Sequence, residues 1–480
     1  MRFRRVSIRQ VLLLLVPLVS FTFFALRVTT FGSYVVQTTA RRFAQPRDQV
    51  PLNTSSPLDL ALSESEEAPA DEPEGEEETA EDAKSRWKEK VPDKPRLYDY
   101  RELFSRTTRD RKYFPIHFGS ETAYNPNIIP HPTKHEMWIV VAQHEQTYED
   151  IESSQQLTCT AGFLNGVLLC ADEPTVLPIA KSVTGHCDGD LAYINFRHGP
   201  RDARMFMGPT APYIVYGSQS GHTCLGLWLQ DTRMLLEEFK LERHVLVEFF
   251  KQATEIQRPL PWKAIEKNFF IFWDADGKAY AHYDLWPLRS FAQIDADGSV
   301  AGADLAPAAE ANDLICMARY MPEVASKLES IHQATNSISI TLCRRKDPGC
   351  TATDDNTFIM HIFHHKTYYD FHGVYEPYIM LFRRRAPFEL YAISTRPFWI
   401  HGRAALTSQS GSMQFKDREE WIPEGHTEFF YIVSMSWMSH GQKYHGYLDD
   451  KMMLSFGIED TRSGAMDVLA ADLVQDLGLC

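Results

Sequence analysis

The stretch GPRDARMF, residues 199–206, lies between two strand-like runs, Leu191–Phe196 and Tyr213–Tyr216. An acid and a base two residues apart in an extended segment, here Asp202 and Arg204, point to the same side because side chains alternate along a strand. A carboxylate and a guanidinium held together at the end of a strand can perform acid–base chemistry on a substrate oxygen. They can equally form a structural ion pair that closes a turn. Similar polar turns recur along the chain, and this recurrence favours a functional site.

The chain from Arg96 onward is rich in aromatic, strand-like segments separated by turns that contain Gly, Asp or Pro. Helical patterns are few, mainly Thr232–Thr254 and Cys316–Ala334. Many short strands at regular spacing indicate an all-β sandwich, barrel or propeller. The predicted strands are Met137–Ala142, Leu164–Cys170, Ala192–Phe196, Tyr213–Gly217, Cys224–Leu229, Phe269–Trp273, Ala279–Tyr283, Ile338–Leu342, Phe358–Phe363, Tyr378–Phe382, Phe388–Ile393, Phe429–Met435 and Met452–Phe456.

The polar turns suggest a repeat. Strand pairs recur in groups roughly 70 to 80 residues apart, and about 385 residues divided into five units give blades of a usual size. The sequence therefore predicts a five-bladed β-propeller over residues 96–480, in which residues far apart in sequence converge near one axis. The repeated features are the turns Tyr124–Asn127, Gly199–Arg204, Glu266–Asn268 and Gly457–Asp460, with the strand His361–His365 between the last two.

In their order, these turns resemble a five-bladed propeller family of β-mannoside phosphorylases, inverting mannosidases and related β-mannosyltransferases. The family pattern has an Asn-Pro near the first blade, then Gly-x-x-Asp-Pro-Arg, a Lys-Asn pair, a His-bearing strand and a late Gly-x-x-Asp. The resemblance covers about residues 110 to 475, with Ala203 where the family usually has Pro and Arg201 where it often has Glu or Tyr. The matching residues are Asn125-Pro126, Gly199-x-x-Asp202-Ala203-Arg204, Glu266-Lys267-Asn268, His361–His365 and Gly457-x-x-Asp460.

The resemblance implies roles for individual residues. Asp202 is the expected general acid or base, because inverting glycosyl chemistry needs one carboxyl group within reach of the glycosidic oxygen. Arg204, Lys267 and one histidine of the His361–His365 strand are expected to bind phosphate or a nucleotide diphosphate, since fixed donors and positive charge stabilise it. Each could instead be an ordinary surface or core residue. The full substrate-binding set that we expect is Asn125, Arg204, Glu266, Lys267, Asn268, His361, His364 and Asp460.

Four further motifs could be taken for metal or ligand sites. Asp274-Ala275-Asp276 is a D-x-D sequence, which binds metal and nucleotide sugar in doubly wound transferases. Here it lies between two predicted strands and ends in Asp276-Gly277, which is typical of a hairpin turn, and Asp295–Gly298 follows the same pattern. Arg383–Arg385 is most simply the end of a hairpin. The adjacent residues His364 and His365 would point to opposite faces of a strand, which disfavours a metal site formed by this pair. We expect neither a metal nor another cofactor.

Composition narrows the partners and the compartment. The formal net charge is −15, whereas a nucleic-acid binder needs a basic face to neutralise phosphates, so we expect no nucleic-acid partner. The eight cysteines include no C-x-x-C pair. In a secretory protein Cys343 and Cys350 could close a small loop as a disulfide, while the partners of the other six stay open.

The N-terminal region predicts a membrane anchor. Four arginines within the first ten residues precede the uncharged apolar run Val11–Leu26, so we expect a cytoplasmic tail over 1–10 and a transmembrane signal anchor over 11–27. A cleaved signal peptide is the alternative. Residues 28–95 are predicted as an acidic disordered stem, because twelve acidic and no basic residues lie between 59 and 82. This layout predicts a single-pass type II protein of the Golgi or endoplasmic reticulum membrane, with residues 96–480 in the lumen.

An anchored, stemmed propeller resembles a fungal Golgi glycosyltransferase. We therefore expect an enzyme that transfers β-linked mannose, or a related sugar, from a sugar-nucleotide or sugar-phosphate donor to a glycan acceptor. One alternative is a glycoside hydrolase or phosphorylase that acts on β-mannosides. A second is a non-catalytic propeller that binds glycans or serves as a scaffold, which would have no need of an acid and two cations such as Asp202, Arg204 and Lys267 at one axis.

Overall fold

The computed structural model describes residues 100–145, 154–239, 249–369, 372–406 and 427–480. The tail, anchor and stem predicted for residues 1–95 lie outside these ranges and stay predictions. Within the described ranges, no helix is long and apolar enough to cross a membrane.

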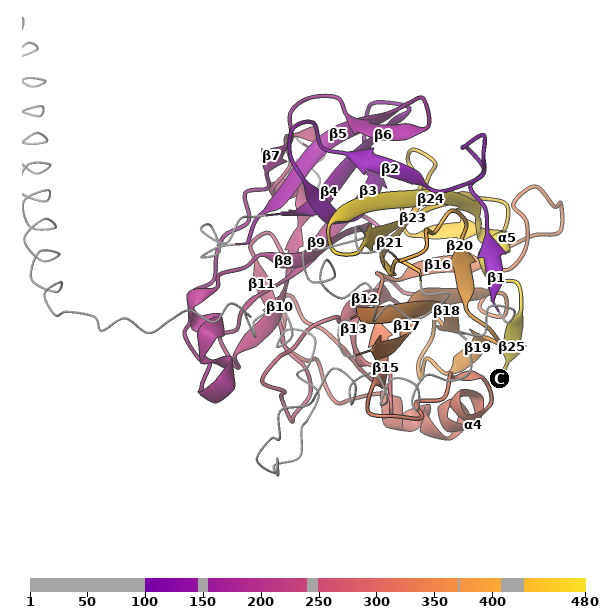
Figure 1. Cartoon of the computed structure of the whole chain (residues 1–480). Helices are drawn as coiled ribbons and strands as arrows, with labels where there is room; N and C mark the ends of the chain where they lie inside the picture. Colours follow the sequence, from indigo (N-terminus) through magenta and orange to yellow (C-terminus); the bar gives the residue numbers. More distant parts are fainter. Residues whose placement is uncertain (1–99, 146–153, 240–248, 370–371, 407–426) are drawn as a thin grey trace, which may run out of the picture. The chain divides into compact units, whose positions relative to one another are not determined.

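The described chain is all-β apart from short helices, as predicted (Figure 1). Its strands follow one another as antiparallel meanders along the chain. The first meander contains β3 (Ala123–Pro130), β4 (Met137–His144), β5 (Gln156–Leu164) and β6 (Val167–Cys170), with β7 (Thr175–Val176) on β5. The second contains β8 (Arg201–Met207), β9 (Pro212–Gln219), β10 (Leu225–Asp231) and β11 (Thr254–Ile256). The third contains β12 (Phe270–Trp273), β13 (Ala279–Asp284) and β14 (Ser290–Gln293).

The next sheet is built around two long strands, β17 (Thr357–Tyr369) and β18 (His372–Arg383). β15 (Glu329–Gln333) and β16 (Ile338–Thr341) pair with successive halves of β17, and β19 (Leu390–Ser394) pairs with β18. β22 (His445–Tyr447) and β25 (Leu477–Leu479) complete this sheet at its two edges. A separate two-stranded sheet joins β1 (Arg101–Leu103) to β20 (Phe398–Ile400).

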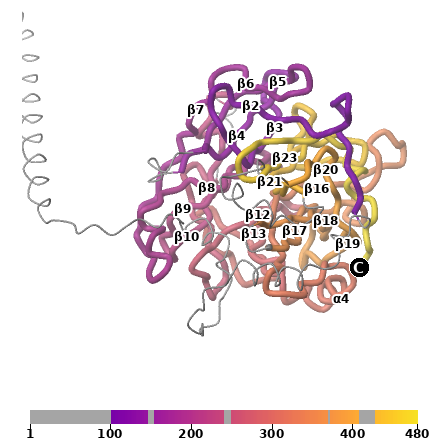
Figure 2. The backbone as a smooth tube through the Cα atoms, in the orientation of Figure 1, coloured from indigo at the N-terminus to yellow at the C-terminus, as the bar shows by residue number. Residues whose placement is uncertain are grey.

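The last meander contains β21 (Phe430–Trp437), β23 (Lys451–Ile458) and β24 (Arg462–Leu469), followed by the short helix α5 (Ala470–Leu473). The early strand β2 (Phe114–His117) pairs with β24 on one side and with β6 on the other. The indigo start and the yellow end of the described chain therefore lie side by side in Figure 2. This pairing joins the first and last meanders into one nine-stranded sheet, so the arrangement is propeller-like, and the count of five blades stays a prediction.

The first strands of different meanders pack against one another. β3 lies against β8 and β21, and β8 lies against β21. Polar side chains bind the backbone of a neighbouring meander: Asn127 Nδ2 of β3 donates to the Ala203 carbonyl at 2.7 Å, and Ser337, which lies just before β16, donates its Oγ to the Ile271 carbonyl of β12 at 2.6 Å. Residues from distant parts of the sequence are thereby brought together along a common line, as the propeller prediction requires.

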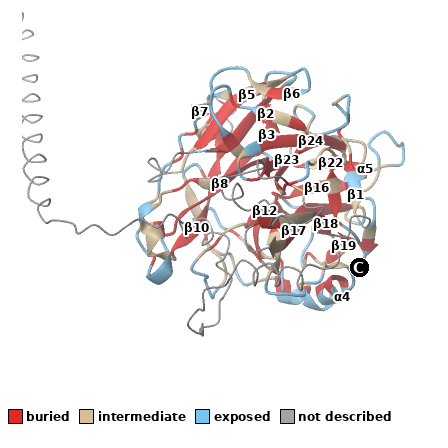
Figure 3. Ribbon diagram, viewed as in Figure 1, coloured by how far each residue is buried: buried red, intermediate tan, exposed pale blue. Residues whose placement is uncertain are grey.

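The core is made of the apolar faces of these strands. Strands such as β9 and β12 are buried along their whole length, and the red colour of the sheet interiors in Figure 3 follows them. Runs of aromatic and β-branched residues that are buried on both faces explain why the sequence shows continuous apolar segments there rather than strict alternation.

Two predicted elements are wrong. The helix expected over Cys316–Ala334 is α4 (Glu310–Tyr320), which begins earlier and ends at Tyr320, and the later part of that stretch contains β15 over Glu329–Gln333. Pro322 explains the end, because the residue before a proline is pushed out of the helical region, and Met321 is extended. The strand expected over Ala192–Phe196 is a 3₁₀ helix over Gly189–Phe196. Within Thr232–Thr254 the described residues form only two short 3₁₀ turns and the start of β11.

All eight cysteines are paired. Cys343–Cys350 closes the small loop that the sequence suggested. The other disulfides are Cys159–Cys170, Cys187–Cys224 and Cys316–Cys480.

Candidate active site

Four of the predicted substrate or catalytic residues share an unusual backbone conformation. Asn125, Asp202, Asn268 and Asp460 have φ values of 53°, 48°, 63° and 48°, in the left-handed region that L-residues other than Asn and Asp rarely adopt. Asn125 and Asp202 lie at register shifts in the β3–β4 and β8–β9 ladders, where an extra residue bulges out of the strand. Such bulges change the direction of side chains and are concentrated at functional sites. The repeated conformation therefore marks one end of the first strands of the meanders, which we call the inner strands.

The two motif glycines allow close packing at this same end. A Cβ atom on Gly457 would overlap the Asn125 side-chain oxygen. A Cβ atom on Gly199 would overlap the Gly217 carbonyl and lie 2.6 Å from the Ser218 hydroxyl. The Gly-x-x-Asp pattern therefore has a direct structural reason, because each glycine lets a neighbouring strand approach the backbone just before the aspartate.

The charges of Asp202 and Asp460 both raise the pKa of two buried tyrosines, Tyr124 and Tyr431. Burial raises the pKa of Tyr124 well above its usual value, and the charges of Asp460 and Asp202 raise it further. Burial also raises the pKa of Tyr431, with the same two carboxylates adding to the effect and the charge of Arg204 opposing it. Both aspartates are exposed, so the structure brings two solvent-accessible carboxylates from β8 and from the end of β23 to one place.

Asp202 is held by its backbone rather than by a salt bridge. Its N–H donates to Gln143 Oε1 at 3.2 Å, and that oxygen also accepts from Gln156 Nε2 at 2.7 Å. No ion pair joins Asp202 to Arg201 or Arg204 within the described stretch 154–239 that contains all three. The structural ion pair that the sequence left open is therefore not formed.

Arg204 lies beneath the carboxylates. Its side chain is buried, with the residue 5% exposed, and its Nη2 donates to Asn268 Oδ1 at 2.7 Å. Its Nε atom is also buried but makes no hydrogen bond to the described residues. A buried guanidinium with an unused N–H group can still donate a hydrogen bond to an oxygen of a phosphate or sugar.

Arg201 and Arg197 add further positive charge. Burial lowers the pKa of Arg201, the nearby charge of Arg197 lowers it more, and Asp202 acts in the opposite direction. Arg197 follows the 3₁₀ helix over Gly189–Phe196, a segment that the sequence analysis assigned to a strand.

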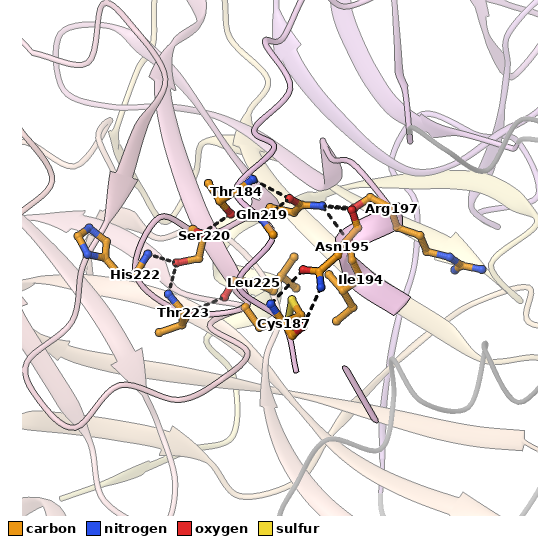
Figure 4. The surroundings of a disulfide bond; sticks show 12 residues. Thr184, Cys187, Ile194, Asn195, Arg197, Gln219, Ser220, His222, Thr223 and Leu225 are labelled. Atoms are coloured by element: carbon orange, nitrogen blue, oxygen red, sulfur yellow. Dashed lines mark hydrogen bonds between the residues drawn. A yellow bond between two sulfur atoms is a disulfide. The ribbon is translucent and has the colours of Figure 1, made fainter. Parts of the chain in front are cut away.

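A disulfide and an amide network hold that 3₁₀ helix in place (Figure 4). Gln219 Nε2 donates to the carbonyl oxygens of Ile194 and Asn195, each at 3.0 Å. Asn195 in turn binds the backbone of Cys187, with Nδ2 donating to its carbonyl at 2.7 Å, and Cys187 is joined to Cys224. These bonds position Arg197 beside Arg201.

The two predicted histidines lie below the surface. His361 stacks on Phe270 with ring centroids 3.9 Å apart, and the ring centroid of His364 lies 4.7 Å from that of Tyr431. Burial, followed by the charge of Arg204, lowers the pKa of His361 to about 3. Burial also lowers the pKa of His364 well below its usual value. Both rings are therefore neutral at pH 7 and fully buried. They pack underneath the site residues, and the structure does not place them as exposed cations that could bind phosphate.

Glu266 and Lys267 have different surroundings although they are adjacent in sequence. Glu266 is buried, accepts the Lys263 N–H at 2.7 Å and pairs with Arg258 Nη1 at 3.3 Å. Its carboxylate is thus used in a structural ion pair rather than shown to a substrate. Lys267 is half-buried, and its charge helps to lower the pKa of His332 to about 3, behind burial and Lys366.

The structure thus brings Asn125, Asp202, Arg204, Asn268 and Asp460 to one end of the inner strands. Tyr124 and Arg201 could have been found from the sequence, because they belong to the same polar turns. Tyr431 carried no such signal, since it is one aromatic residue in a strand full of them. Within the described ranges, no group of three or more His, Cys, Asp or Glu side chains is arranged to hold a metal ion.

No protein-family model matches the sequence, and no curated protein matches it. Solved structures with a similar fold include a β-1,2-mannobiose phosphorylase from Listeria innocua, with 10% identity, 79% of this chain and 99% of that chain covered, and a TM-score of 0.40. A GDP-Man-dependent mannosyltransferase from Leishmania mexicana has 10% identity, coverage of 82% and 94%, and a TM-score of 0.37. A mannose phosphorylase from the same organism, solved with a phosphate ion, has 11% identity, coverage of 77% and 94%, and a TM-score of 0.34. At these identities and TM-scores the similarity assigns no activity to this chain.

Proposed function

We propose that the protein is a carbohydrate-active enzyme, a glycosyltransferase that transfers β-linked mannose or a related sugar to a glycan acceptor. The observation that carries this proposal is the exposed carboxylate of Asp202 on a left-handed bulge, beside Asp460 and above the buried guanidinium of Arg204. A carboxylate in such a position can exchange a proton with a sugar oxygen, and fixed cations next to it can hold a phosphate.

In the proposed reaction, Asp202 accepts the proton of an acceptor hydroxyl as that oxygen forms a bond to the anomeric carbon of the donor sugar. The bond from the anomeric carbon to the phosphate oxygen breaks, and the departing phosphate keeps the electron pair. Arg204, Arg201 and Lys267 stabilise the negative charge that develops there. Asn125, Asn268 and Asp460 would bind sugar hydroxyls.

Hydrolysis or phosphorolysis of a β-mannoside is the second candidate function. The presence of two exposed carboxylates, Asp202 and Asp460, supports this candidate. An inverting hydrolase needs one carboxyl group to protonate the leaving oxygen and another to activate water. Asp202 and Asp460 could divide these tasks, whereas a phosphorylase would use phosphate itself as the nucleophile.

A donor screen with the purified full-length protein tests these alternatives. The protein would be incubated with β-mannoside acceptors and either nucleotide sugars or mannose 1-phosphate, and separately with β-mannosides in water or in phosphate. Product formed only from a nucleotide sugar supports the transferase. Product from β-mannosides in water or in phosphate would replace it with the hydrolase or the phosphorylase, and no turnover in any arm would favour a glycan-binding scaffold.

We also propose that residues 96–480 lie in the lumen of the Golgi or endoplasmic reticulum behind a type II anchor. The four disulfides support this location, because such bonds persist in oxidising compartments. A C-terminal tag should then be protected from protease in intact vesicles, and digestion of that tag would contradict the proposed topology.

A further inference from the structure

A cavity lies at the opposite end of the inner strands from Asp202. Its volume is about 980 Å³, and its lining includes Trp273, Arg345, Arg384 and Lys443. Trp273 ends β12, whereas Asn268 of the candidate active site precedes the same strand (Figure 1). Five residues of extended chain at about 3.3 Å each separate them by roughly 16 Å. The cavity is therefore distinct from the site described above, and its volume lies in the range of small-molecule sites.

The carboxylates in the cavity wall are already satisfied. Asp274 Oδ1 accepts the N–H groups of Asp276 and Lys278, both at 2.9 Å, and its Oδ2 accepts the Tyr280 hydroxyl at 3.1 Å. Asp450 accepts from Arg345 at 2.6 Å, from Gln442 at 2.8 Å and from its own turn. The D-x-D sequence is thus a hairpin turn, as predicted, and its first aspartate folds back on that turn.

The cations in the wall retain unused donors. Arg384 donates its Nε to Asp354 at 2.8 Å and makes no other side-chain hydrogen bond to the described residues. Lys443 Nζ donates to the Thr210 carbonyl at 2.6 Å, which leaves two of its three N–H groups. A guanidinium fork matches two oxygens of one phosphate or sulfate, and an ammonium group adds a point charge.

His445 also lines this cavity. Its Nε2 forms a hydrogen bond with the Thr341 hydroxyl at 2.7 Å. Burial lowers the pKa of His445, the charges of Arg384 and Arg345 lower it further, and Asp450 opposes them. The cavity therefore combines satisfied acceptors with unsatisfied positive donors.

We propose that this cavity binds an oxyanion of the phosphate or sulfate class, either free or esterified to a sugar, at a site separate from the catalytic one. Arg384 and Lys443 are the residues that would contact it. The cavity is larger than a bare oxyanion needs, and the lining by Trp273 and Tyr444 gives room and apolar surface for a sugar that carries the anion. The inference does not rest on the proposed transferase activity.

The chain offers a matched control for the test. Arg384 and Arg385 are adjacent and both pair with Asp354, but only Arg384 lines the cavity. Binding to the full-length protein would be measured by calorimetry with inorganic phosphate, inorganic sulfate, mannose 6-phosphate and N-acetylglucosamine 6-sulfate, with mannose as the neutral control. The Arg384→Gln, Arg385→Gln and Lys443→Met variants would be compared.

We expect Arg384→Gln to weaken oxyanion binding about 10- to 100-fold, the usual effect of losing a charged hydrogen bond. Arg385→Gln should change it less than about twofold on the same scale. Tighter binding of the sugar esters would assign the site to an acidic sugar, and equal binding of inorganic phosphate would assign it to the free ion. Equal losses in Arg384→Gln and Arg385→Gln, or no binding of any of the four anions by the parent protein, would overturn the proposal.

Discussion

The two ends of the inner strands present opposite chemistry although they belong to the same sheets. At the Asp202 end, left-handed residues turn two carboxylates toward solvent, and Arg204 is buried beneath them without an ion pair in the described chain. At the other end, the carboxylates of Asp274 and Asp450 already accept hydrogen bonds from nearby backbone N–H groups, whereas Arg384 and Lys443 have unused N–H donors. The difference teaches that an acid in a turn signals function only when the backbone directs it away from that turn.

The largest effect should come from Asp202→Asn, which keeps the size of the side chain but removes the group that exchanges a proton. Loss of general acid–base help commonly costs about 10² to 10⁴ in rate, so turnover should fall by that factor. Asp276→Asn changes an exposed aspartate at the other end and should leave the rate unchanged. Rates would be measured beside melting curves. An Asp202→Asn protein that melts normally and turns over at the parent rate would end the catalytic assignment.

A smaller effect is expected from Lys267→Met, which removes a positive charge at the Asp202 end. If Lys267 meets a donor phosphate, its loss should raise the KM for the donor about 10- to 100-fold, the range of a charged hydrogen bond, with less change in kcat. Lys278→Met removes an exposed lysine from the turn after β12 and is the matched control. Equal KM values in the two variants would show that Lys267 does not bind the donor.

The neutral histidines under the Asp202 end should make stability fall in acid. The folded pKa of His361 is about 3 against an ordinary value of 6.5, so the unfolded chain binds a proton between these values and the folded protein does not. The stabilisation is complete above about pH 6.5 and is lost as the pH falls toward 3. At pH 5.5, one unit below the ordinary value, this costs roughly 1.4 kcal/mol.

The test compares the parent with His361→Gln in denaturant melts at pH 7.5 and 5.5. The variant should lose less stability than the parent between the two pH values, whatever its stability at pH 7.5. The pH dependence, rather than the absolute stability, distinguishes titration of this ring from its packing on Phe270. Identical pH dependence in both proteins would show that His361 already titrates normally in the folded state.

A further prediction concerns the packing that shapes the Asp202 end, and its expected size is similar to that of the pH effect. Gly457→Ala places a methyl group on the Asn125 side-chain oxygen and should destabilise the fold by about 1–3 kcal/mol, the usual cost of overpacking. Gly217→Ala is the control, because its nearest contact would be the Arg201 carbonyl at an ordinary 3.7 Å. Denaturant midpoints measure both, and a Gly457→Ala protein as stable as the Gly217→Ala protein would contradict the close approach.

Much of the fold could be predicted from the sequence. Strands such as β4, β9 and β12 follow from continuous runs of aromatic and β-branched residues. The predicted helix over Cys316–Ala334 begins and ends later than α4, because the prediction continued the helical pattern past Pro322. The segment Gly189–Phe196 could not be predicted, since its 3₁₀ form depends on Gln219 and on the Cys187–Cys224 disulfide, both outside the segment.

The candidate site was predictable only where its residues belong to marked turns. Asn125, Asp202 and Asp460, which the structure places at one end of the inner strands, could be predicted as candidates because glycine or proline lies near each of them in a recognisable pattern. The position of Tyr431 in the site and the burial of His361 result from the packing of strands that are distant in sequence. No local sequence pattern records such packing. Glu266 also lies in a motif turn, but its carboxylate pairs with Arg258, and its contact with a substrate stays a prediction.

The strand β2 has a consequence for the order in which the domain folds. Phe114 pairs with Ala465, and Ile116 pairs with Leu168, so β2 needs partners from both ends of the described chain. During synthesis the β6 side is available early, but the β24 side exists only after almost the entire polypeptide has emerged. Contacts between residues so far apart in sequence slow folding. The edge of β2 that faces β24 would therefore stay open to wrong partners for most of translation, which makes the interval before β24 pairs with β2 the time when this protein most depends on chaperones.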